Sequence, residues 1–315
     1  KTAQQGLLRV AYAAAPAALA TAVCGDRVGG YVLEALLGVD RPGVRTFRAR
    51  CVAEGCAVAV GKHVLLRLAA LRGSGSWEPL LAVEAEARLL QRLRHPAVPR
   101  LLGTCQVDSP EDRGYALVQR LPPGRPLEAV GPMTPATPQL RALAEQLLGL
   151  CGYLAACEPP AAHGGLSPAT VLVEGWVPGG KHVKVTVLGF AAEGAAAVEA
   201  GGTFSFAAPE ACGRGATPLG DLYSVGAVIL YAATGRDPDT LLRGSSRTDL
   251  HTALANVEGL QDAGLLPLLV ALLAPRPGDR PPSAEAALQL LRGVRSGVAP
   301  SGRPARGRGP RPALR

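Results

Sequence analysis

The stretch HGGLSPATVL, residues 163–172, decides how the second half of this 315-residue chain is interpreted. Four further short segments follow it in order: LGFA (188–191), GTFSFAAPE (202–210), DLYSVG (221–226) and DRP (279–281). Each segment alone has little specificity. Their order and intervals carry the information, and they have to be weighed against the pattern of the whole chain.

The residues before this stretch predict a β-rich unit. Short runs of branched residues, bounded by Gly, Pro and Asp, are typical of strands. One helix is expected among them at 78–94, because Leu81, Ala85, Leu89 and Leu93 recur at helical spacing. The expected strands are Tyr31–Leu37, Arg45–Cys51, Ala57–Leu68, Leu101–Gln106 and Tyr115–Gln119.

The run LPPGRP at 121–126 breaks every regular pattern and predicts a hinge. Helical patterns dominate after it, at 137–156, 221–234, 265–273 and 283–292. The chain is therefore expected to be α+β and bilobal, with a small β-rich lobe carrying one helix and a larger helical lobe. The expected divisions are an N-terminal extension (1–30), the small lobe (31–120), the hinge (121–126), the large lobe (127–294) and a disordered tail (295–315).

The five segments together resemble the signature set of protein kinases. HGGLSPATVL resembles the catalytic loop, LGFA the metal-binding turn, and GTFSFAAPE the end of the activation segment. Glu86, ten residues before Pro96, resembles the glutamate of the αC helix. The resemblance covers about Tyr31 to Arg292 and is strongest to bacterial and plastid-type Ser/Thr kinases, so it implies a kinase-like fold.

The residues that would perform the chemistry are replaced. Kinases use an Asp near the attacking hydroxyl and hold Mg²⁺ with an Asp and an Asn. The resemblance puts Gly165 at the catalytic Asp, Ser167 at the neighbouring Lys, Thr170 at the metal-binding Asn, and Gly189 at the Asp of the next motif. Each such loss typically costs on the order of 10²–10⁴ in rate. We therefore expect no catalytic residues and no metal site.

The nucleotide-clamping features also depart from the kinase pattern. The glycine-rich loop, at 37–43, keeps only Gly38 and Gly43 and contains an acid and a proline. The third strand places Gly61 at the expected Lys and Lys62 one residue later. A bulge at Gly61 would let Lys62 pair with Glu86 and bind a cofactor, and without one Lys62 is solvated. No cofactor is expected, and ATP is the alternative.

Residues that hold the kinase fold together are retained. By resemblance, His163, Phe190 and Leu90 form an apolar core beneath the catalytic loop. Glu210 and Arg280 would make a buried ion pair, and Asp221 would bind the backbone of the catalytic loop. Losing one partner of a buried pair costs about 3–5 kcal/mol, which explains why fold residues can remain when chemical ones are lost.

The net charge of +8 is concentrated at the C-terminus. The acid-free residues 295–315 contain six arginines, including Arg303, Arg306, Arg308 and Arg311, which leaves the rest of the chain close to neutral. Without an aromatic residue for base stacking, the tail is expected to contact RNA or an acidic surface electrostatically. No apolar run reaches the ~18–20 residues of a membrane helix, so no membrane span is expected.

These observations predict a pseudokinase that acts as a structural or protein-interaction module, with protein partners in a multi-subunit complex. One alternative is a regulator that binds nucleotide without transferring phosphate. Another is an atypical active Ser/Thr kinase that recruits Lys62, Glu86 and a displaced acid such as Glu174 or Glu193. An intracellular location is expected. The plastid-type resemblance favours the chloroplast, with mitochondrion and cytoplasm as alternatives.

Overall fold

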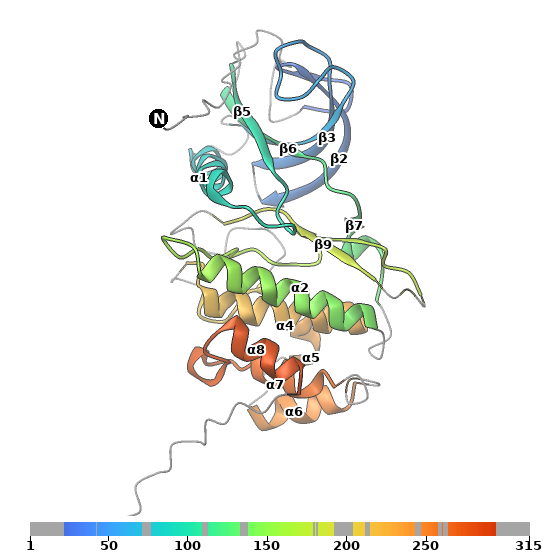
Figure 1. The fold of residues 1–315 in the computed structure, drawn as a ribbon, viewed down its shortest axis with the longest axis vertical. Coiled ribbons are helices and arrows are strands. Elements are labelled where there is room, and N and C mark those ends of the chain that lie inside the picture. The colour runs from blue at the N-terminus through green and yellow to red at the C-terminus, as the bar shows by residue number, and fades with distance from the viewer. Residues whose placement is uncertain are drawn as a thin grey trace, which may run out of the picture.

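A curled antiparallel sheet with one helix stands above a helical lobe in the computed structural model (Figure 1). The expected α+β class and bilobal arrangement are confirmed. Glu193 and the tail 295–315 lie outside the described residues, which are 22–41, 43–70, 77–108, 113–132, 138–178, 180, 182–191, 204–211, 215–242, 247–257, 260 and 264–293.

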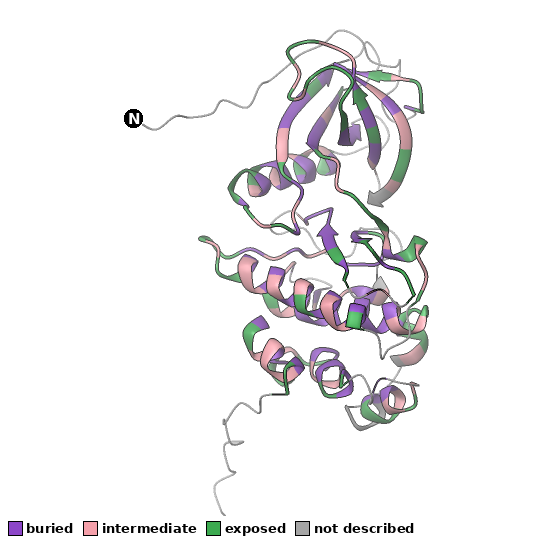
Figure 2. Cartoon of the chain, turned by 45° about the vertical axis from the view of Figure 1, so that its right-hand side comes forward, coloured by how far each residue is buried: buried purple, intermediate pink, exposed green. Residues whose placement is uncertain are grey.

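The sheet of the small lobe has the strand order β1-β2-β3-β4-β6-β5. Burial alternates along the second half of β3, whereas β4 is buried from Val64 to Ala70, and Figure 2 shows both buried and exposed residues on the strands of this sheet. Ala22 and Val28 lie in the core of this sheet, so the small lobe includes residues that the sequence assigns to the extension 1–30. The strands are β1 (Arg27–Val28), β2 (Tyr31–Arg41), β3 (Val44–Cys51), β4 (His63–Ala70), β5 (Leu101–Asp108) and β6 (Arg113–Arg120).

The strand expected at Ala57–Leu68 begins later than predicted, at His63. Residues 52–62 form a turn region instead, in which Gly55 and Gly61 have φ angles of 77° and 84°. Such positive φ angles are available to glycine and break an extended strand. This later start matters for the site, because Arg67 then lies inside β4 and Lys62 lies in the turn before it.

Helix α1 (Glu78–Arg92) packs against the sheet with a different face from the one predicted. Leu81, expected in the core, is 57% exposed, whereas Val83, Ala87 and Leu90 are buried. Glu86 lies on this buried face although it is charged. The helix is therefore oriented by a polar partner as well as by apolar burial.

The large lobe is built around α4 (Pro218–Thr234), whose residues from Asp221 to Leu230 are all buried. Helix α2 (Pro138–Ala155) packs against α4 and α8 (Ala284–Leu291). A small sheet of β7 (Arg125–Pro126), β8 (Val171–Glu174) and β9 (Lys184–Val187) lies between α2 and the small lobe. The remaining elements are η2 (Leu127–Ala129), η4 (Phe204–Phe206), α5 (Pro238–Leu242), α6 (Arg247–Ala255), α7 (Leu266–Leu272) and η5 (Pro277–Asp279).

None of the helices in the described part of the chain is both long and apolar enough to cross a bilayer.

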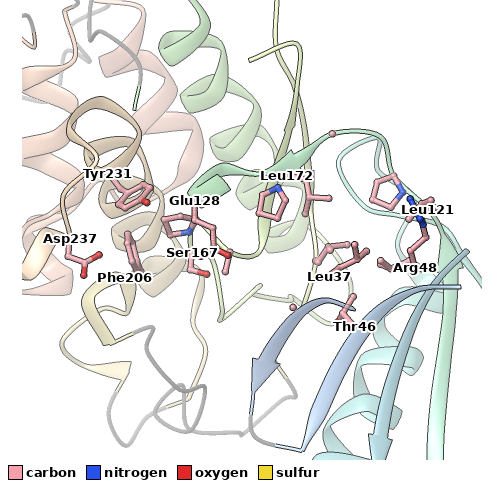
Figure 3. A pocket seen from close by; sticks show the side chains of 18 residues that line it. Leu37, Thr46, Arg48, Leu121, Glu128, Ser167, Leu172, Phe206, Tyr231 and Asp237 are labelled. Carbon is pink, nitrogen blue, oxygen red and sulfur yellow. The ribbon is translucent and has the colours of Figure 1, made fainter. Parts of the chain in front are cut away.

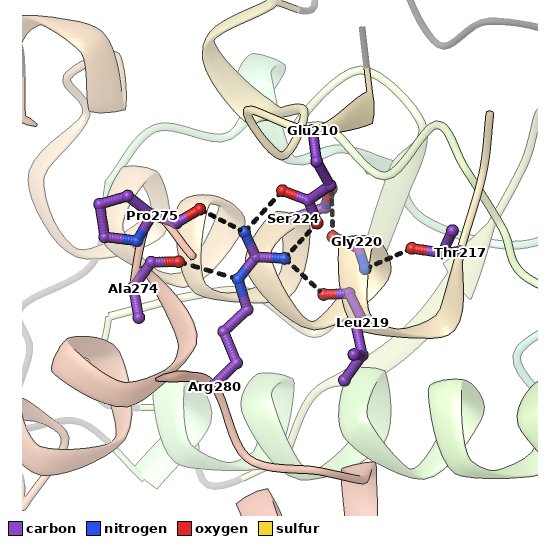
Figure 4. A network of polar contacts seen from close by, with 8 residues as sticks. All are labelled: Glu210, Thr217, Leu219, Gly220, Ser224, Ala274, Pro275 and Arg280. Carbon is purple, nitrogen blue, oxygen red and sulfur yellow. Dashed lines mark hydrogen bonds and ion pairs between the residues drawn. The ribbon is translucent and has the colours of Figure 1, made fainter. Parts of the chain in front are cut away.

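Arg280 joins three segments of the large lobe (Figure 4). Its Nη1 and Nη2 atoms donate to the two carboxylate oxygens of Glu210, at 2.5 and 2.8 Å. Its remaining donors reach the carbonyls of Ala274, Leu219 and Pro275. The arginine is only 4% exposed, so the donors of the guanidinium are satisfied inside the protein.

We expect Arg280→Ala to lower the free energy of unfolding by about 3–5 kcal/mol, because it leaves the Glu210 carboxylate partly buried without its partner. Arg276→Ala removes an exposed arginine four residues earlier and should change it by less than about 0.5 kcal/mol. Urea unfolding of both variants measures the difference. Equal, small effects would show that the ion pair is dispensable.

Candidate functional site

Asp221 fixes the backbone of the loop that contains HGGLSPATVL. Its carboxylate accepts hydrogen bonds from the N–H groups of His163 (2.6 Å) and Gly164 (2.8 Å). Asp221 lies in the first turn of α4, after the N-cap Thr217. Complete burial raises the pKa of Asp221 to about 6, and the two N–H donors oppose this shift.

Because the folded-state pKa of Asp221 lies above its ordinary value of 3.8, the folded protein binds this proton more tightly than the unfolded chain does. The contribution of Asp221 to stability should therefore increase as the pH falls from about 6 toward 4. We expect the difference in unfolding free energy between the wild type and Asp221→Asn to grow by on the order of 2–3 kcal/mol over that interval. Urea titrations of both proteins from pH 7 to pH 4 test this, and a constant difference would contradict it.

His163, Phe190 and Leu90 connect this loop to the small lobe. The rings of His163 and Phe190 lie with their centroids 4.4 Å apart. Leu90 of α1 belongs to the same apolar cluster as Phe190. The N–H of Phe190 also donates to Glu86 Oε1, at 3.2 Å. One helix of the small lobe is thus held to the LGFA turn by both apolar and polar contacts.

The partner of Glu86 is Arg67 rather than Lys62. Arg67 Nη1 contacts Glu86 Oε2, and the two side chains are 0% and 1% exposed. Lys62 is exposed in the turn before β4, which is the solvated alternative predicted for it. Residues inside β4 alternate between the two faces of the sheet, so Arg67 points toward α1 with Leu65 and Ala69.

Removing one member of this buried pair leaves the other charge uncompensated. We expect Glu86→Ala to lower the unfolding free energy by about 3–5 kcal/mol. The matched replacement of both residues, Arg67→Met with Glu86→Leu, should recover most of that loss, because no unpaired charge stays buried. Lys62→Ala should be within about 0.5 kcal/mol of the wild type. Denaturant titration measures the unfolding free energy of all three variants. A loss of several kcal/mol in Lys62→Ala would contradict the assignment of Arg67 as the partner of Glu86.

The four replaced positions meet in one place. The Thr170 hydroxyl accepts from the N–H of Ser167 and donates to the carbonyl of Gly165, both at 2.9 Å. It is therefore already used to shape the loop. A Cβ built on Gly165 would lie 3.1 Å from the carbonyl oxygen of Gly189, which is closer than ordinary contact. An aspartate at position 165 would require this backbone to move.

Gly164 packs even more tightly. A Cβ there would lie 2.5 Å from Cβ of Ala216 and 2.7 Å from Cβ of Ala191, and its φ is +69°. The N–H of Ala191 donates to the carbonyl of His163 at 2.7 Å, which holds the two segments together. The loop and the LGFA turn are thus in direct backbone contact, an arrangement that glycine allows.

A cavity of about 550 Å³ lies beside the hinge, lined by residues of both lobes (Figure 3). Leu65 of β4 packs with Leu172 and Leu188 of the large lobe, and Leu121 of the hinge adjoins them. These four leucines form one wall. The glycine-rich loop contributes Leu37 and Gly38 to the lining.

The opposite end of the cavity is acidic and aromatic. Glu128 and Asp237 line it together with Phe206 and Tyr231. Arg48 of β3 is the one basic residue in the described lining, and its Nε lies 3.5 Å from Glu34 Oε2. Across the described part of the chain, no three His, Cys, Asp or Glu side chains gather as metal ligands would.

Two features of the site were not found from the sequence. Arg67 has a sequence signal, because it is the single charged residue in the apolar run VLLRLAA at 64–70, 19 residues before Glu86. The acidic end of the cavity has none, because Glu128 and Asp237 lie more than a hundred residues apart. The displaced acid Glu174 lies exposed at the end of β8 and does not line the cavity.

No family model and no curated protein sequence matches this chain. Among solved structures, it is similar to the kinase domain of Mycobacterium tuberculosis PknI. The TM-score is 0.56 at 16% identity, and the match covers 87% of this chain and 100% of that one. A C20A mutant of the same domain gives a TM-score of 0.57 at 16% identity, with 88% and 100% covered. This similarity shows a protein kinase-like fold.

Proposed function

With the fold of a protein kinase domain as the premise, we propose that the chain is a pseudokinase, a catalytically inactive module with a structural or protein-interaction role. One observation carries the proposal. By the kinase resemblance, Gly165, Ser167, Thr170 and Gly189 stand at the positions of the base, its neighbouring Lys and the metal ligands. A Cβ at Gly165 would lie 3.1 Å from the carbonyl oxygen of Gly189, so an aspartate there would require the backbone to shift. Phosphoryl transfer relies on positioning and charge neutralisation, and these residues provide neither.

The electrostatics of the cavity also disfavour a nucleoside triphosphate. Glu128 and Asp237 line it with two carboxylates, and the described lining offers only Arg48 against them. The guanidinium of Arg67 is compensated by Glu86. Without metal ligands, the phosphate charges would face carboxylates in a partly enclosed space, where repulsion is strengthened by the lower dielectric.

Two features support the interaction role: hydrogen-bond networks that keep the large lobe folded, and apolar side chains exposed at the start of α1. The Arg280 and Asp221 networks keep the large lobe and its loop in shape although the chemical residues are replaced. Trp77 and Leu81, one helical turn apart at the start of α1, are 58% and 57% exposed. Large apolar side chains exposed together are typical of protein contacts. A multi-subunit complex, and a chloroplast location on the plastid-type resemblance, belong to this proposal.

A nucleotide-binding regulator is the second candidate, and two observations favour it. The cavity lies beside the hinge with ample volume, and the Arg67–Glu86 pair is intact. The two candidates differ in whether ATP stabilises the protein.

We expect the thermal unfolding midpoint to stay unchanged in millimolar ATP with Mg²⁺ or Mn²⁺. Among the described residues no group of metal ligands is found, and the one cation of the described cavity lining, Arg48, already contacts Glu34. Binding at 100 times Kd would add about 2.7 kcal/mol of stability and would select the regulator. In the variant E128Q/D237N, a shift that the wild type lacks would show that the carboxylates exclude ATP.

Phosphate transfer to a generic protein substrate is measured in the same buffers. No transfer above that of a buffer control is expected. Transfer that Glu174→Gln or Glu193→Gln abolishes would overturn the pseudokinase proposal and assign those acids to an atypical kinase.

A further inference from the structure

Three cysteine thiols surround one buried tyrosine in the small lobe. Tyr31 of β2 pairs with Cys51 of β3 across the sheet. The phenol oxygen of Tyr31 accepts a hydrogen bond from the N–H of Ala57, at 3.3 Å. Burial raises the pKa of Tyr31. Its neighbours Cys56, Cys51 and Cys105 raise this pKa further, because their thiolates would repel the phenolate. All three thiols therefore lie close to the phenol.

Two of these thiols are in contact across one turn. Cys51 is the last residue of β3, and its Sγ lies 3.3 Å from the carbonyl oxygen of Ala53 and 3.4 Å from that of Val58. The Cys51 thiol therefore lies inside the turn that carries Cys56. A side-chain hydrogen bond joins the thiols of Cys51 and Cys56. The two sulfur atoms are thus neighbours although four residues separate them in the sequence.

The surrounding backbone keeps both cysteines in this arrangement. The carbonyl of Cys51 accepts from the N–H of Gly61 at 2.8 Å, and the N–H of Cys51 donates to the carbonyl of Lys62 at 2.9 Å. Cys56 Sγ lies 3.8 Å from the carbonyl oxygen of Gly30. A Cβ built on Gly30 would overlap this sulfur atom. The space that Gly30 leaves is therefore occupied by the Cys56 thiol.

The three thiols differ in how a reagent in solution can reach them. Cys56 is half-buried, whereas Cys51 is 0% exposed. Burial raises the pKa of the Cys105 thiol to about 12, so Cys105 stays protonated and unreactive. Burial and the adjacent Cys51 thiol also raise the pKa of Cys56. Its reaction is therefore slow at neutral pH, and Cys56 is a poor leaving group once it belongs to a disulfide.

We propose that Cys51 and Cys56 form a reversible dithiol–disulfide pair that locks the turn between β3 and β4. With a low-molecular-weight disulfide such as oxidised glutathione, the Cys56 thiolate forms a mixed disulfide and releases one glutathione thiolate. The Cys51 sulfur then attacks Cys56 Sγ, which forms the protein disulfide and releases the second glutathione thiolate. The two thiol protons pass to these thiolates, so two protein thiols are oxidised and one glutathione disulfide is reduced. This inference does not depend on whether the chain transfers phosphate.

Tryptic mapping of the full wild-type chain tests the pair directly. Cleavage after Arg50 and Lys62 releases both cysteines in one peptide, 51–62. After incubation with oxidised glutathione and alkylation without reductant, this peptide should lack two hydrogen atoms and carry no alkyl group. Dithiothreitol should restore both thiols. A mixed disulfide that persists at Cys56, or a link from peptide 51–62 to another cysteine such as Cys105, would overturn the proposal.

Single variants separate the roles of the two thiols. Cys51→Ser should accumulate the glutathione mixed disulfide at Cys56, because the second thiol is missing. Cys56→Ser should leave the fully buried Cys51 without glutathione. The matched control Cys24→Ser removes an exposed cysteine outside this turn and should leave the rate of disulfide closure within about twofold of the wild type. Glutathione on Cys51 in the Cys56→Ser variant would overturn the proposed order of attack.

Thermal unfolding measures whether the disulfide locks the turn. The midpoint of the oxidised wild type should exceed that of the reduced protein by on the order of 5 °C, because the closed loop restricts the unfolded chain. Cys24→Ser should show the same difference, and Cys56→Ser should show none. Equal midpoints for reduced wild type and for wild type whose peptide 51–62 is fully oxidised would overturn the lock.

Discussion

The buried pair of Arg67 and Glu86 is the interaction on which the junction of the lobes depends. Two charges that are almost fully removed from water persist only if each is compensated. Glu86 has two such partners: it pairs with Arg67, and it also accepts a hydrogen bond from the N–H of Phe190 in the large lobe. From Phe190 the contacts continue to the ring of His163, whose backbone N–H donates to the Asp221 carboxylate. A single path of polar and aromatic contacts thus runs from β4 to α4.

The glycines beside this path have a structural consequence beyond the loss of chemical groups. At Gly164 and Gly165 the absence of side chains lets this loop lie closer to Ala191, Ala216 and the carbonyl of Gly189 than a Cβ would allow. The Thr170 hydroxyl then completes the loop from inside. The region is stabilised by close backbone packing, whereas a catalytic site keeps polar groups open to a ligand. Restoring one acid would therefore disturb packing before it restored chemistry.

Much of this could be predicted from the sequence. The α+β class and the two lobes followed from strand-like runs, the LPPGRP break and the helical periodicity after it. Glu210, Asp221 and Arg280 make the contacts that the kinase resemblance implied. The register of β4 could not be predicted, because two positive-φ glycines end the turn at His63 and no pattern marks that shift. The acidic cavity end also escaped, because it is formed by residues that only the tertiary fold brings together.

An apolar contact between the lobes determines how their junction responds to temperature and salt. It is the wall formed by Leu65, Leu172, Leu188 and Leu121. Apolar contact is driven by water, and this driving force weakens on cooling and is strengthened by salts that are excluded from protein surfaces. An interface held by exposed charges alone would respond in the opposite sense to salt. The leucine wall therefore lets the two lobes stay together in concentrated salt and makes cold, rather than ionic strength, the condition that loosens them.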